Sequence, residues 1–262
     1  TEILVTGAFK AAFEGVRNYS LSATYGVLIL SMLLVFASVY ADRLDCRELT
    51  WLLARGWRKF GHNFFRPACP GCRACIPLRV PVERFRPSRS QERVLRRCAH
   101  VRVTFGPLRY ESPLFDLYQR HSRVRFGQEH SFEDFAASLH SPSCPAVLSR
   151  YEVDGRLVGA GYLDRGSDGL SSVYFVFDPD ASRLSLGTFS VLREIGETRR
   201  LGLPYYYLGY VVAGCDRMAY KSRFGPHQLF DWDDGLWHEE GRVPEPPSPG
   251  MIPLFSGWTG PD

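Results

Sequence analysis

Apolar and polar positions follow a strand-like pattern through much of the second half of the chain. Four segments have the alternation or the β-branched and aromatic content of strands: 146–153, 156–163, 170–177 and 205–212. Asp154-Gly155 separates the first two and is a dipeptide typical of a tight hairpin turn. The segment 185–203 has helical spacing of apolar residues and begins at Ser185. The order strand, strand, strand, helix, strand predicts an α+β fold with a mixed sheet and flanking helices.

Shorter helices are predicted where a polar N-cap residue precedes an apolar or basic stripe. Such residues are Asp45, Ser88, Ser112 and Ser131. Asp45 with Glu48, and Ser88 with Gln91, have the spacing of a capping box. The segment 76–85 alternates like a strand but contains prolines, which favours an edge position in a sheet.

The first forty residues differ from the rest of the chain. Residues 21–41 carry no charge and are long enough to span a membrane, but a pair of buried strands is the preferred interpretation, and a signal peptide is a third alternative. A membrane partner is therefore not expected, but it stays open. We divide the chain into an N-terminal Cys/Arg-rich domain (1–100, with 1–41 atypical), a larger domain (101–230) and a Pro/Gly/acidic tail (231–262).

Basic residues are concentrated in one stretch. Residues 51–110 contain fourteen Lys or Arg, and the only acids there are Glu83 and Glu92. Such a block is typical of a protein with a polyanionic partner, the alternative being a solvated surface. On the predicted helix 89–98, four arginines share one flank at helical spacing, an arrangement suited to a phosphate backbone: Arg89, Arg93, Arg96 and Arg97.

Three of the seven cysteines have metal-ligand spacing. Cys69, Cys72 and Cys75 form C-x2-C-x2-C, which supplies three thiolates, whereas zinc or an iron–sulfur cluster usually needs a fourth ligand. The alternative is a structural or redox-sensitive cysteine turn. The odd number of cysteines does not suggest a secreted disulfide framework, so a reducing, cytoplasmic location is expected.

Two long segments carry a specific resemblance. WLLARGWRKFGHNFFRPACPGCRACIPLRVPVERFRPSRSQERVLRRC (51–98) and SSVYFVFDPDASRLSLGTFSVLREIGETRRLGLPYYYLGYVVAGCDRMAYKSRFGP (171–226) resemble the two signatures of the aminoacyl-tRNA–protein transferases. The likeness covers roughly 43–230 and is nearer to the bacterial aspartate/glutamate leucyltransferases than to the eukaryotic arginyltransferases. Residues 1–41 contain nothing like the Cys-Pro-Tyr-Leu-Pro stretch usual in the family.

The resemblance implies a GNAT-like acyltransferase domain behind a smaller N-terminal domain. It implies transfer of leucine, with arginine second, from aminoacyl-tRNA to the α-amine of proteins beginning with Asp or Glu, which marks them for degradation in the N-degron pathway. No cofactor is required, because the donor ester is already activated. Eukaryotic relatives bind an iron–sulfur cluster with cysteines of this region and an N-terminal pair that this chain lacks.

The candidate site residues follow from charge and from this resemblance. Lys221, one of three lysines, is expected to bind the acidic acceptor together with Arg223 and Tyr220, while Tyr207 and Tyr220 are candidates for positioning. The residues expected to contact tRNA are Arg66, Arg73, Arg79, Arg89, Arg93 and Arg97. Two rival functions are a CoA-dependent GNAT acetyltransferase and a non-catalytic tRNA-binding protein.

Overall fold

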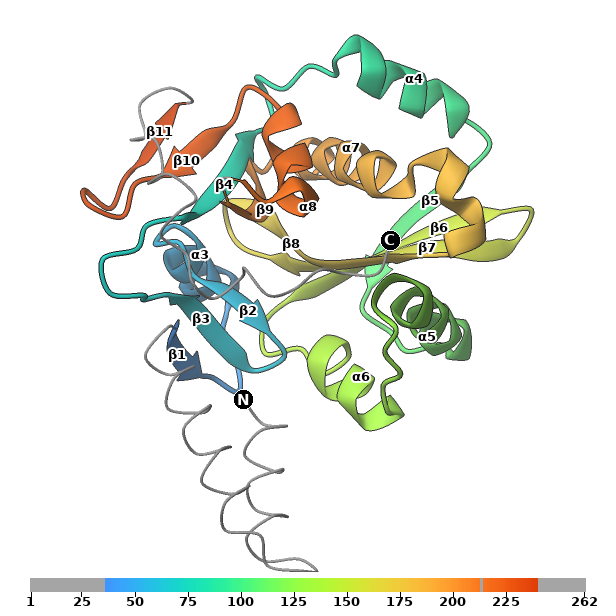
Figure 1. Ribbon diagram of the computed structural model, residues 1–262, viewed down its shortest axis with the longest axis horizontal. Coiled ribbons are helices and arrows are strands. Elements are labelled where there is room, and N and C mark those ends of the chain that lie inside the picture. Colours follow the sequence, from blue (N-terminus) through green and yellow to red (C-terminus); the bar gives the residue numbers. More distant parts are fainter. Residues whose placement is uncertain (1–35, 213, 240–262) are drawn as a thin grey trace, which may run out of the picture.

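The computed structural model describes residues 36–212 and 214–239 of the chain, which form two sheets and their helices (Figure 1). The larger sheet has eight strands in the order β11-β10-β4-β9-β8-β7-β6-β5, and the smaller has three in the order β1-β3-β2. The strands of the larger sheet are β4 (Cys75–Pro81), β5 (Arg102–Pro107), β6 (Ala146–Val153), β7 (Arg156–Arg165), β8 (Gly169–Phe177), β9 (Tyr205–Val212), β10 (Gln228–Phe230) and β11 (Trp237–Glu239).

The central strands and their connecting helix follow the sequence pattern closely. β6 and β7 form the predicted hairpin, and both turn residues, Asp154 and Gly155, have positive φ angles as the tight turn requires. β8 then pairs antiparallel with β7 but parallel with β9, since α7 (Leu186–Arg200) carries the chain back across the sheet. The predicted mixed sheet with flanking helices is confirmed.

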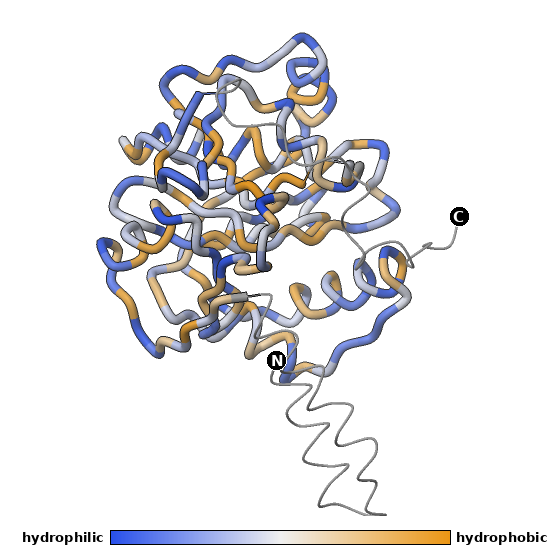
Figure 2. Tube along the Cα trace, turned by 60° about the vertical axis from the view of Figure 1, so that its left-hand side comes forward, coloured by the Kyte–Doolittle hydropathy of each residue, from blue (hydrophilic) through white to orange (hydrophobic). Residues whose placement is uncertain are grey.

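Helices cover both faces of the larger sheet. Figure 1 shows α4 (Arg89–Arg97) and α7 on one face, and α5 (Ser112–Phe126) with α6 (Phe132–Leu139) on the other. The N-cap predictions hold for α3 (Cys46–Leu53), α4 and α6, whose caps accept hydrogen bonds from the first turn. Helix α5 begins at Ser112 itself, with Glu111 as its N-cap. Figure 2 shows hydrophobic residues along the inner strands and hydrophilic ones at the outer turns.

Strand β4 corrects two predictions. It lies inside the sheet, between β9 and β10, and not at an edge. Its prolines are tolerated because β10 pairs with it only at Leu78 and Arg79, so no ladder is required at Pro77 or Pro81 on that side. Since β4 comes from residues assigned to an N-terminal domain, the larger sheet extends across the expected boundary at residue 100.

The expected tail also begins later than residue 231. Residues 231–239 form a turn and β11, which pairs with β10, and Trp237 packs edge-on against Tyr207 and Phe230. The short hairpin is stabilised by aromatic burial, which the polar composition of the segment concealed. Two short helices precede it, α8 (Asp216–Ala219) and η2 (Tyr220–Arg223), and η1 (Pro179–Leu184) precedes α7.

The three-stranded sheet contacts the larger one through a buried ion pair. Its strands are β1 (Phe36–Tyr40), β2 (Arg58–Phe60) and β3 (Asn63–Pro67). Lys59 Nζ lies 3.1 Å from Asp164 Oδ1 on β7, and both side chains are almost fully buried. Most of the segment 21–41 lies outside the described residues. Within them, no helix has the length and apolar content to cross a membrane.

Replacing Lys59 with Met should destabilise the fold, because it leaves Asp164 buried without its cation. We expect a loss of about 3–5 kcal/mol near neutral pH, measured by urea unfolding. Burial already raises the pKa of Asp164, and loss of Lys59 raises it further. The destabilisation comes from the ionised form of Asp164. It should therefore shrink as the pH falls through the pKa of Asp164 in the folded variant, and it should disappear below the pKa of Asp164 in the unfolded chain. The exposed Arg47→Met variant is the control; an equal effect there, or a penalty independent of pH, would contradict the prediction.

Candidate active site

The parallel strands β8 and β9 separate soon after they meet. They pair only from Gly169 with Tyr205 to Ser171 with Tyr207, although β8 continues to Phe177. Beyond that point, their facing edges no longer hydrogen bond to each other. Backbone groups at such a parting need other partners, and they are available to a ligand or to side chains from elsewhere. We call this opening, between 172–177 and 208–212, the splay.

Arg58 enters the splay from the small sheet. The first residue of β2, it donates a hydrogen bond from Nη2 to the backbone carbonyl of Ser172, the first β8 residue beyond the paired segment. Burial lowers the pKa of its guanidinium. Nothing local in the sequence distinguishes Arg58 from the other thirteen basic residues of 51–110, and sequence reasoning did not select it.

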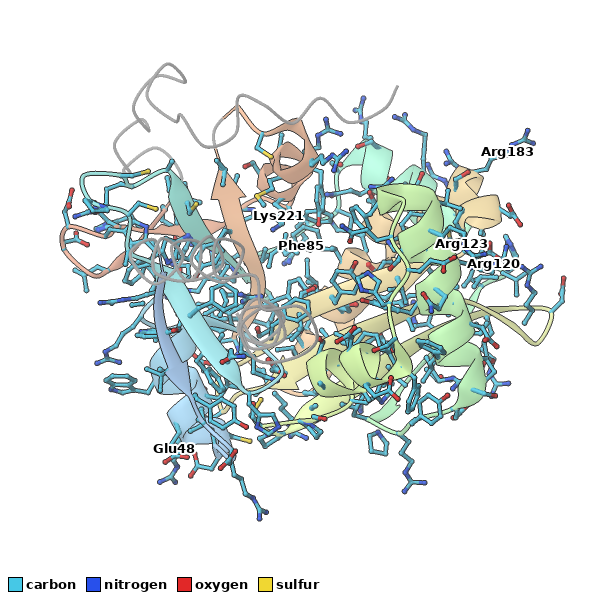
Figure 3. All side chains as sticks on the ribbon, turned by 60° about the horizontal axis from the view of Figure 1, so that its bottom comes forward. Glu48, Phe85, Arg120, Arg123, Arg183 and Lys221 are labelled. Carbon is cyan, nitrogen blue, oxygen red and sulfur yellow. The ribbon has the colours of Figure 1, made fainter. Side chains whose placement is uncertain are left out.

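Lys221 reaches the opposite side of the splay from η2. Its Nζ donates a 2.7 Å hydrogen bond to the carbonyl of Tyr210 on β9. Figure 3 shows it inside the molecule, whereas Arg183 lies at the periphery. A Cβ added at Gly209 would stand 3.2 Å from Lys221 Nζ and 3.7 Å from Arg58 Nη2, so both cations approach the same point of the backbone. Gly209, with φ of 98°, supplies both the conformation and the room.

Neither of these cations forms an ion pair in the part of the chain that the structure describes, although Asp164, the partner of Lys59, interacts electrostatically with Arg58 from farther away. No carboxylate oxygen there lies within 4.0 Å of Arg58 or Lys221, and their hydrogen bonds go to the two carbonyls. Burial and the neighbouring Arg58 charge lower the pKa of Lys221 to about 8. An anion bound between them would relieve this repulsion.

The other predicted acceptor residues are placed differently. Arg223 is exposed, and its carbonyl accepts a 3.0 Å hydrogen bond from Gln91 of α4, so Arg58 is the arginine that shares a site with Lys221. Tyr220 lies next to Lys221 in η2, and burial raises the pKa of its phenol. Tyr207 is buried, and its hydroxyl donates to Asp168 over 2.8 Å.

The predicted tRNA residues divide into exposed and buried ones. Arg89, Arg93 and Arg97 are exposed along α4, which packs beside α7. Arg73 is also exposed, and Arg66 stacks on Trp57.

Arg79 differs from the other five. It is buried, with its guanidinium 3.7 Å from the Tyr205 ring and 4.4 Å from that of Trp237, while Nε donates to Gln228 over 2.8 Å. Such stacking makes Arg79 part of the core under the β10–β11 hairpin and removes it from the exposed basic surface.

The cysteine motif does not form a converged ligand set. Cys69, Cys72 and Cys75 line a cavity of about 330 Å³ between β3 and β4 with Arg66, Arg73 and Trp232. Among the described residues, these sulfur atoms do not all lie within 4.8 Å of one another, as a shared metal ion would require. Burial and the neighbouring thiols raise the pKa of Cys75 to about 11, which favours the thiol over the thiolate. The three thiols therefore do not converge on a single metal ion, and an iron–sulfur cluster or zinc at this motif stays a prediction.

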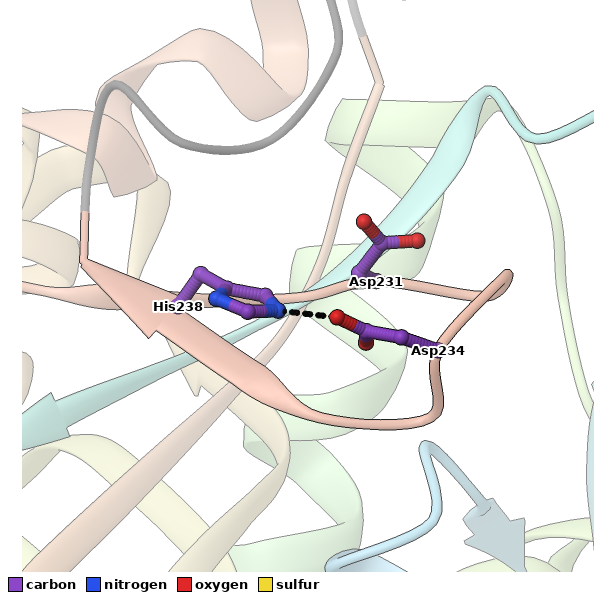
Figure 4. A group of neighbouring side chains, drawn as sticks. All are labelled: Asp231, Asp234 and His238. Atoms are coloured by element: carbon purple, nitrogen blue, oxygen red, sulfur yellow. Dashed lines mark hydrogen bonds and ion pairs between the residues drawn. The ribbon is translucent and has the colours of Figure 1, made fainter.

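A different group has potential metal-ligand geometry. In residues 36–212 and 214–239, the only three ligand atoms within 4.8 Å of one another belong to Asp231, Asp234 and His238 (Figure 4). Each aspartate also accepts a backbone N–H of the turn, and His238 Nε2 contacts Asp234 Oδ2 at 2.6 Å. These bonds explain the group as a brace of the β10–β11 turn.

A mixed sheet whose parallel strands part beside a returning helix defines the GNAT-like fold, as the sequence predicted. Solved structures similar to the chain include FemX, with a TM-score of 0.49, 10% identity and coverage of 80% of this chain and 73% of that one. A tandem GNAT protein from the clavulanic acid biosynthesis pathway has a TM-score of 0.41, 13% identity and coverage of 80% and 66%.

The chain belongs to the arginine-tRNA–protein transferase family. Its residues 23–93 match the family's N-terminal profile and 111–231 its C-terminal profile. Relatives named aspartate/glutamate leucyltransferase include those of Chromobacterium violaceum, 35% identical over 76% of this chain and 84% of the relative, and Marinobacter nauticus, 38% identical over 75% and 84%. The resemblance seen in the sequence is confirmed. Such enzymes move an amino acid from tRNA to a protein N-terminus.

The geometry of the splay suits this chemistry. The donor is an ester and the nucleophile an α-amine with a pKa of about 7.7–8.0, so no covalent intermediate on the protein is needed. Backbone N–H groups freed where the strands part could stabilise the tetrahedral oxyanion. Holding amine and ester together could contribute about 7–11 kcal/mol to lowering the barrier.

The shared site of Arg58 and Lys221 can be tested by titration. With only three lysines, the chain gives a simple spectrum when lysine carries ¹³C at Cε. We expect one resonance to titrate near pH 8, to vanish in Lys221→Met, and to titrate at higher pH in Arg58→Met, because a like charge has been removed. Arg223→Met is the matched control and should leave it unchanged. The opposite pattern would place Arg223, and not Arg58, beside Lys221.

Proposed function

We propose that the protein transfers leucine from leucyl-tRNA to the α-amine of proteins that begin with Asp or Glu, and that Arg58 and Lys221 bind the acceptor's side-chain carboxylate. The observation that carries this proposal is the pair of half-buried cations in the splay, which hydrogen bond to backbone carbonyls and form no ion pair among the described residues. An acidic side chain supplies the missing anion and anchors the adjacent α-amine near the donor ester.

The two cations complement a carboxylate in different ways. Arg58 offers a planar fork of N–H donors, one of which is held by Ser172, so its orientation is set before the ligand arrives. Lys221 offers a compact charge that a carboxylate would strengthen by raising the pKa of its amine from about 8. An amide side chain such as that of Asn has the same size as Asp but brings no charge, so it should bind poorly.

The choice of leucine is supported by the relatives, which are named aspartate/glutamate leucyltransferases, and arginine is the second candidate donor. We also propose that the reaction needs no cofactor, since the ester bond already carries the activation. A cytoplasmic location follows from the use of aminoacyl-tRNA, which is made in that compartment.

The reaction is tested with labelled Leu-tRNA and Arg-tRNA and two peptides that differ only in an N-terminal Asp or Asn. We expect label from Leu-tRNA in the Asp peptide. Loss of either Lys221 or Arg58, each changed to Met, should lower the Asp-over-Asn ratio of kcat/KM by about 30-fold or more, as for one partner of a desolvated charge pair.

Arg223→Met is again the matched control, since this arginine has an exposed side chain on the same short helix. It should keep most of the Asp-over-Asn ratio. Absence of label with both donors would contradict the transferase proposal, and acetylation of a peptide from acetyl-CoA would favour the rival GNAT function. An equal fall for both peptides in the Lys221 and Arg58 variants would assign those residues to the fold or the tRNA end.

Binding of tRNA should depend on the exposed arginines of α4. Changing Arg89, Arg93 and Arg97 together to Ala should weaken binding and reduce the magnitude of the slope of log K against log salt by about three, because each phosphate contact contributes close to one. The measurement is a salt series of tRNA-binding isotherms. Arg79→Met should leave this slope unchanged but lower the melting temperature, since Arg79 is enclosed by aromatic rings. A slope that depends on Arg79 and not on α4 would place the tRNA on the other side of the sheet.

A further inference from the structure

A carboxylic acid lies inside the protein against the same two strands. Glu194 of α7 is 2% exposed, and its carboxylate accepts hydrogen bonds from Tyr206 of β9 and from Ser149 of β6, the latter at 3.3 Å. Gly161 of β7 leaves the room, because a Cβ there would stand 2.6 Å from Glu194 Oε1. Four elements therefore shape a place for this carboxyl group.

The group has donors but no counter-charge. In the described part of the chain, no Lys, Arg or His nitrogen lies within 4.0 Å of the Glu194 carboxylate. A buried acid held only by hydroxyl groups adds little to stability, since an apolar residue would fill the same space without loss of hydration. Burial raises the pKa of Glu194 to about 7, despite the hydrogen bonds that lower it. Both protonation states are then accessible near neutral pH.

A hydroxyl group connects this acid to the splay. Tyr206 donates to Glu194 and also interacts with the side chain of Ser172, the residue whose carbonyl holds Arg58. Tyr206 is in the last segment that pairs with β8, immediately before the strands part. Tyr220, the neighbour of Lys221, interacts electrostatically with both Glu194 and Tyr206. Tyr206 is fully buried, and through this one phenol the acid is linked to Ser172, whose carbonyl holds Arg58 at the splay.

We propose that Glu194, acting through Tyr206, takes the proton that the acceptor's α-ammonium must lose before it attacks the ester; this rests on the proposed function. The ammonium N–H bond breaks as its proton passes to Tyr206 Oη, while the phenolic proton passes to Glu194. The step converts a carboxylate and an ammonium into a carboxylic acid and a neutral amine, and Tyr206 ends as the phenol it was. In this scheme Tyr206 is the catalytic residue at the amine, and Glu194 acts through it.

The groups facing the acid fit this role. The titratable groups that face Glu194 are Tyr151 on β6, Tyr206 on β9 and Tyr220 on η2. Arg193 on α7 interacts electrostatically with Tyr151. Burial raises the pKa of all three tyrosines, so each stays a phenol near neutral pH and Glu194 is the acid that titrates there. The sequence pattern of α7 also marks this residue. Glu194 is an acid on the buried face of the helix, beside Ser190, Val191 and Ile195.

The test is the pH dependence of transfer to an Asp-starting peptide in single-turnover reactions, with whichever aminoacyl-tRNA the parent protein uses. Glu194→Gln keeps the shape of the side chain but cannot accept the proton. We expect a loss of about six- to tenfold at pH 7, because only about a tenth to a sixth of an α-amine with a pKa of about 7.7–8.0 is already neutral there. The loss should nearly vanish at pH 9, where most of the amine is neutral without a base. Tyr206→Phe should behave in the same way.

Glu197→Gln is the matched control on the same helix, because Glu197 pairs with Arg200 at 2.7 Å and does not join the network. Melting curves separate catalysis from folding. A raised carboxyl pKa means that the parent loses stability as the pH rises from about 4.3 towards 7, and Glu194→Gln should remove that loss. An equal fall in rate at every pH, or a fall equal to that of Glu197→Gln, would overturn the proposal.

A second measurement needs no donor, so it is informative even when no transfer is found. Difference infrared spectra of parent minus Glu194→Gln report the protonated carboxyl group. At pH 7.5 to 8, binding of an Asp-starting peptide should increase this band, and the α-acetylated peptide, which has no proton to give, should not. If no transfer is found but the carboxyl band still responds to the free α-amine of the peptide, only the proposed function is overturned. If the carboxyl band is the same with the free and the acetylated peptide, the role of Glu194 is overturned.

Discussion

The candidate active site depends on one constraint, the short parallel pairing of β8 and β9. Strands that part leave backbone acceptors without their ladder partners, and in this protein two cations satisfy a carbonyl on each side of the opening. Arg58 and Lys221 are thereby drawn to one point although 163 positions separate them in the sequence. Each cation hydrogen bonds to a carbonyl and forms no ion pair within the described ranges, so an anion bound between the two would be attracted by both charges.

The small N-terminal sheet has a clear purpose in this arrangement. Consecutive residues of β2 reach different strands of the larger sheet: Arg58 binds the Ser172 carbonyl on β8, and Lys59 pairs with the buried Asp164 on β7. The ion pair fixes where β2 lies, and that position delivers the guanidinium to the splay. The stability of the junction and the chemistry of the site are therefore linked through two adjacent side chains.

The two faces of the larger sheet contribute different residues to the candidate site. Arg58 arrives from the side of the small sheet, whereas Glu194 belongs to α7, with the exposed arginines of α4 beside it. Gln91 of α4 donates to the carbonyl of Arg223 in η2, which joins the basic helix to the segment that carries Lys221.

The sequence by itself determined the central strands, the capped helices and the family, because periodicity, capping and motif spacing are local properties, and it named Lys221 as a candidate. It did not determine the interior position of β4, the β10–β11 hairpin, or the burial of Arg79, since these depend on which distant aromatic residues and strands pack together. Only the tertiary structure selected Arg58 over Arg223 and revealed Glu194 beside Tyr206. Fourteen basic residues look alike in a sequence; what distinguishes one of them is the carbonyl it reaches when two strands part.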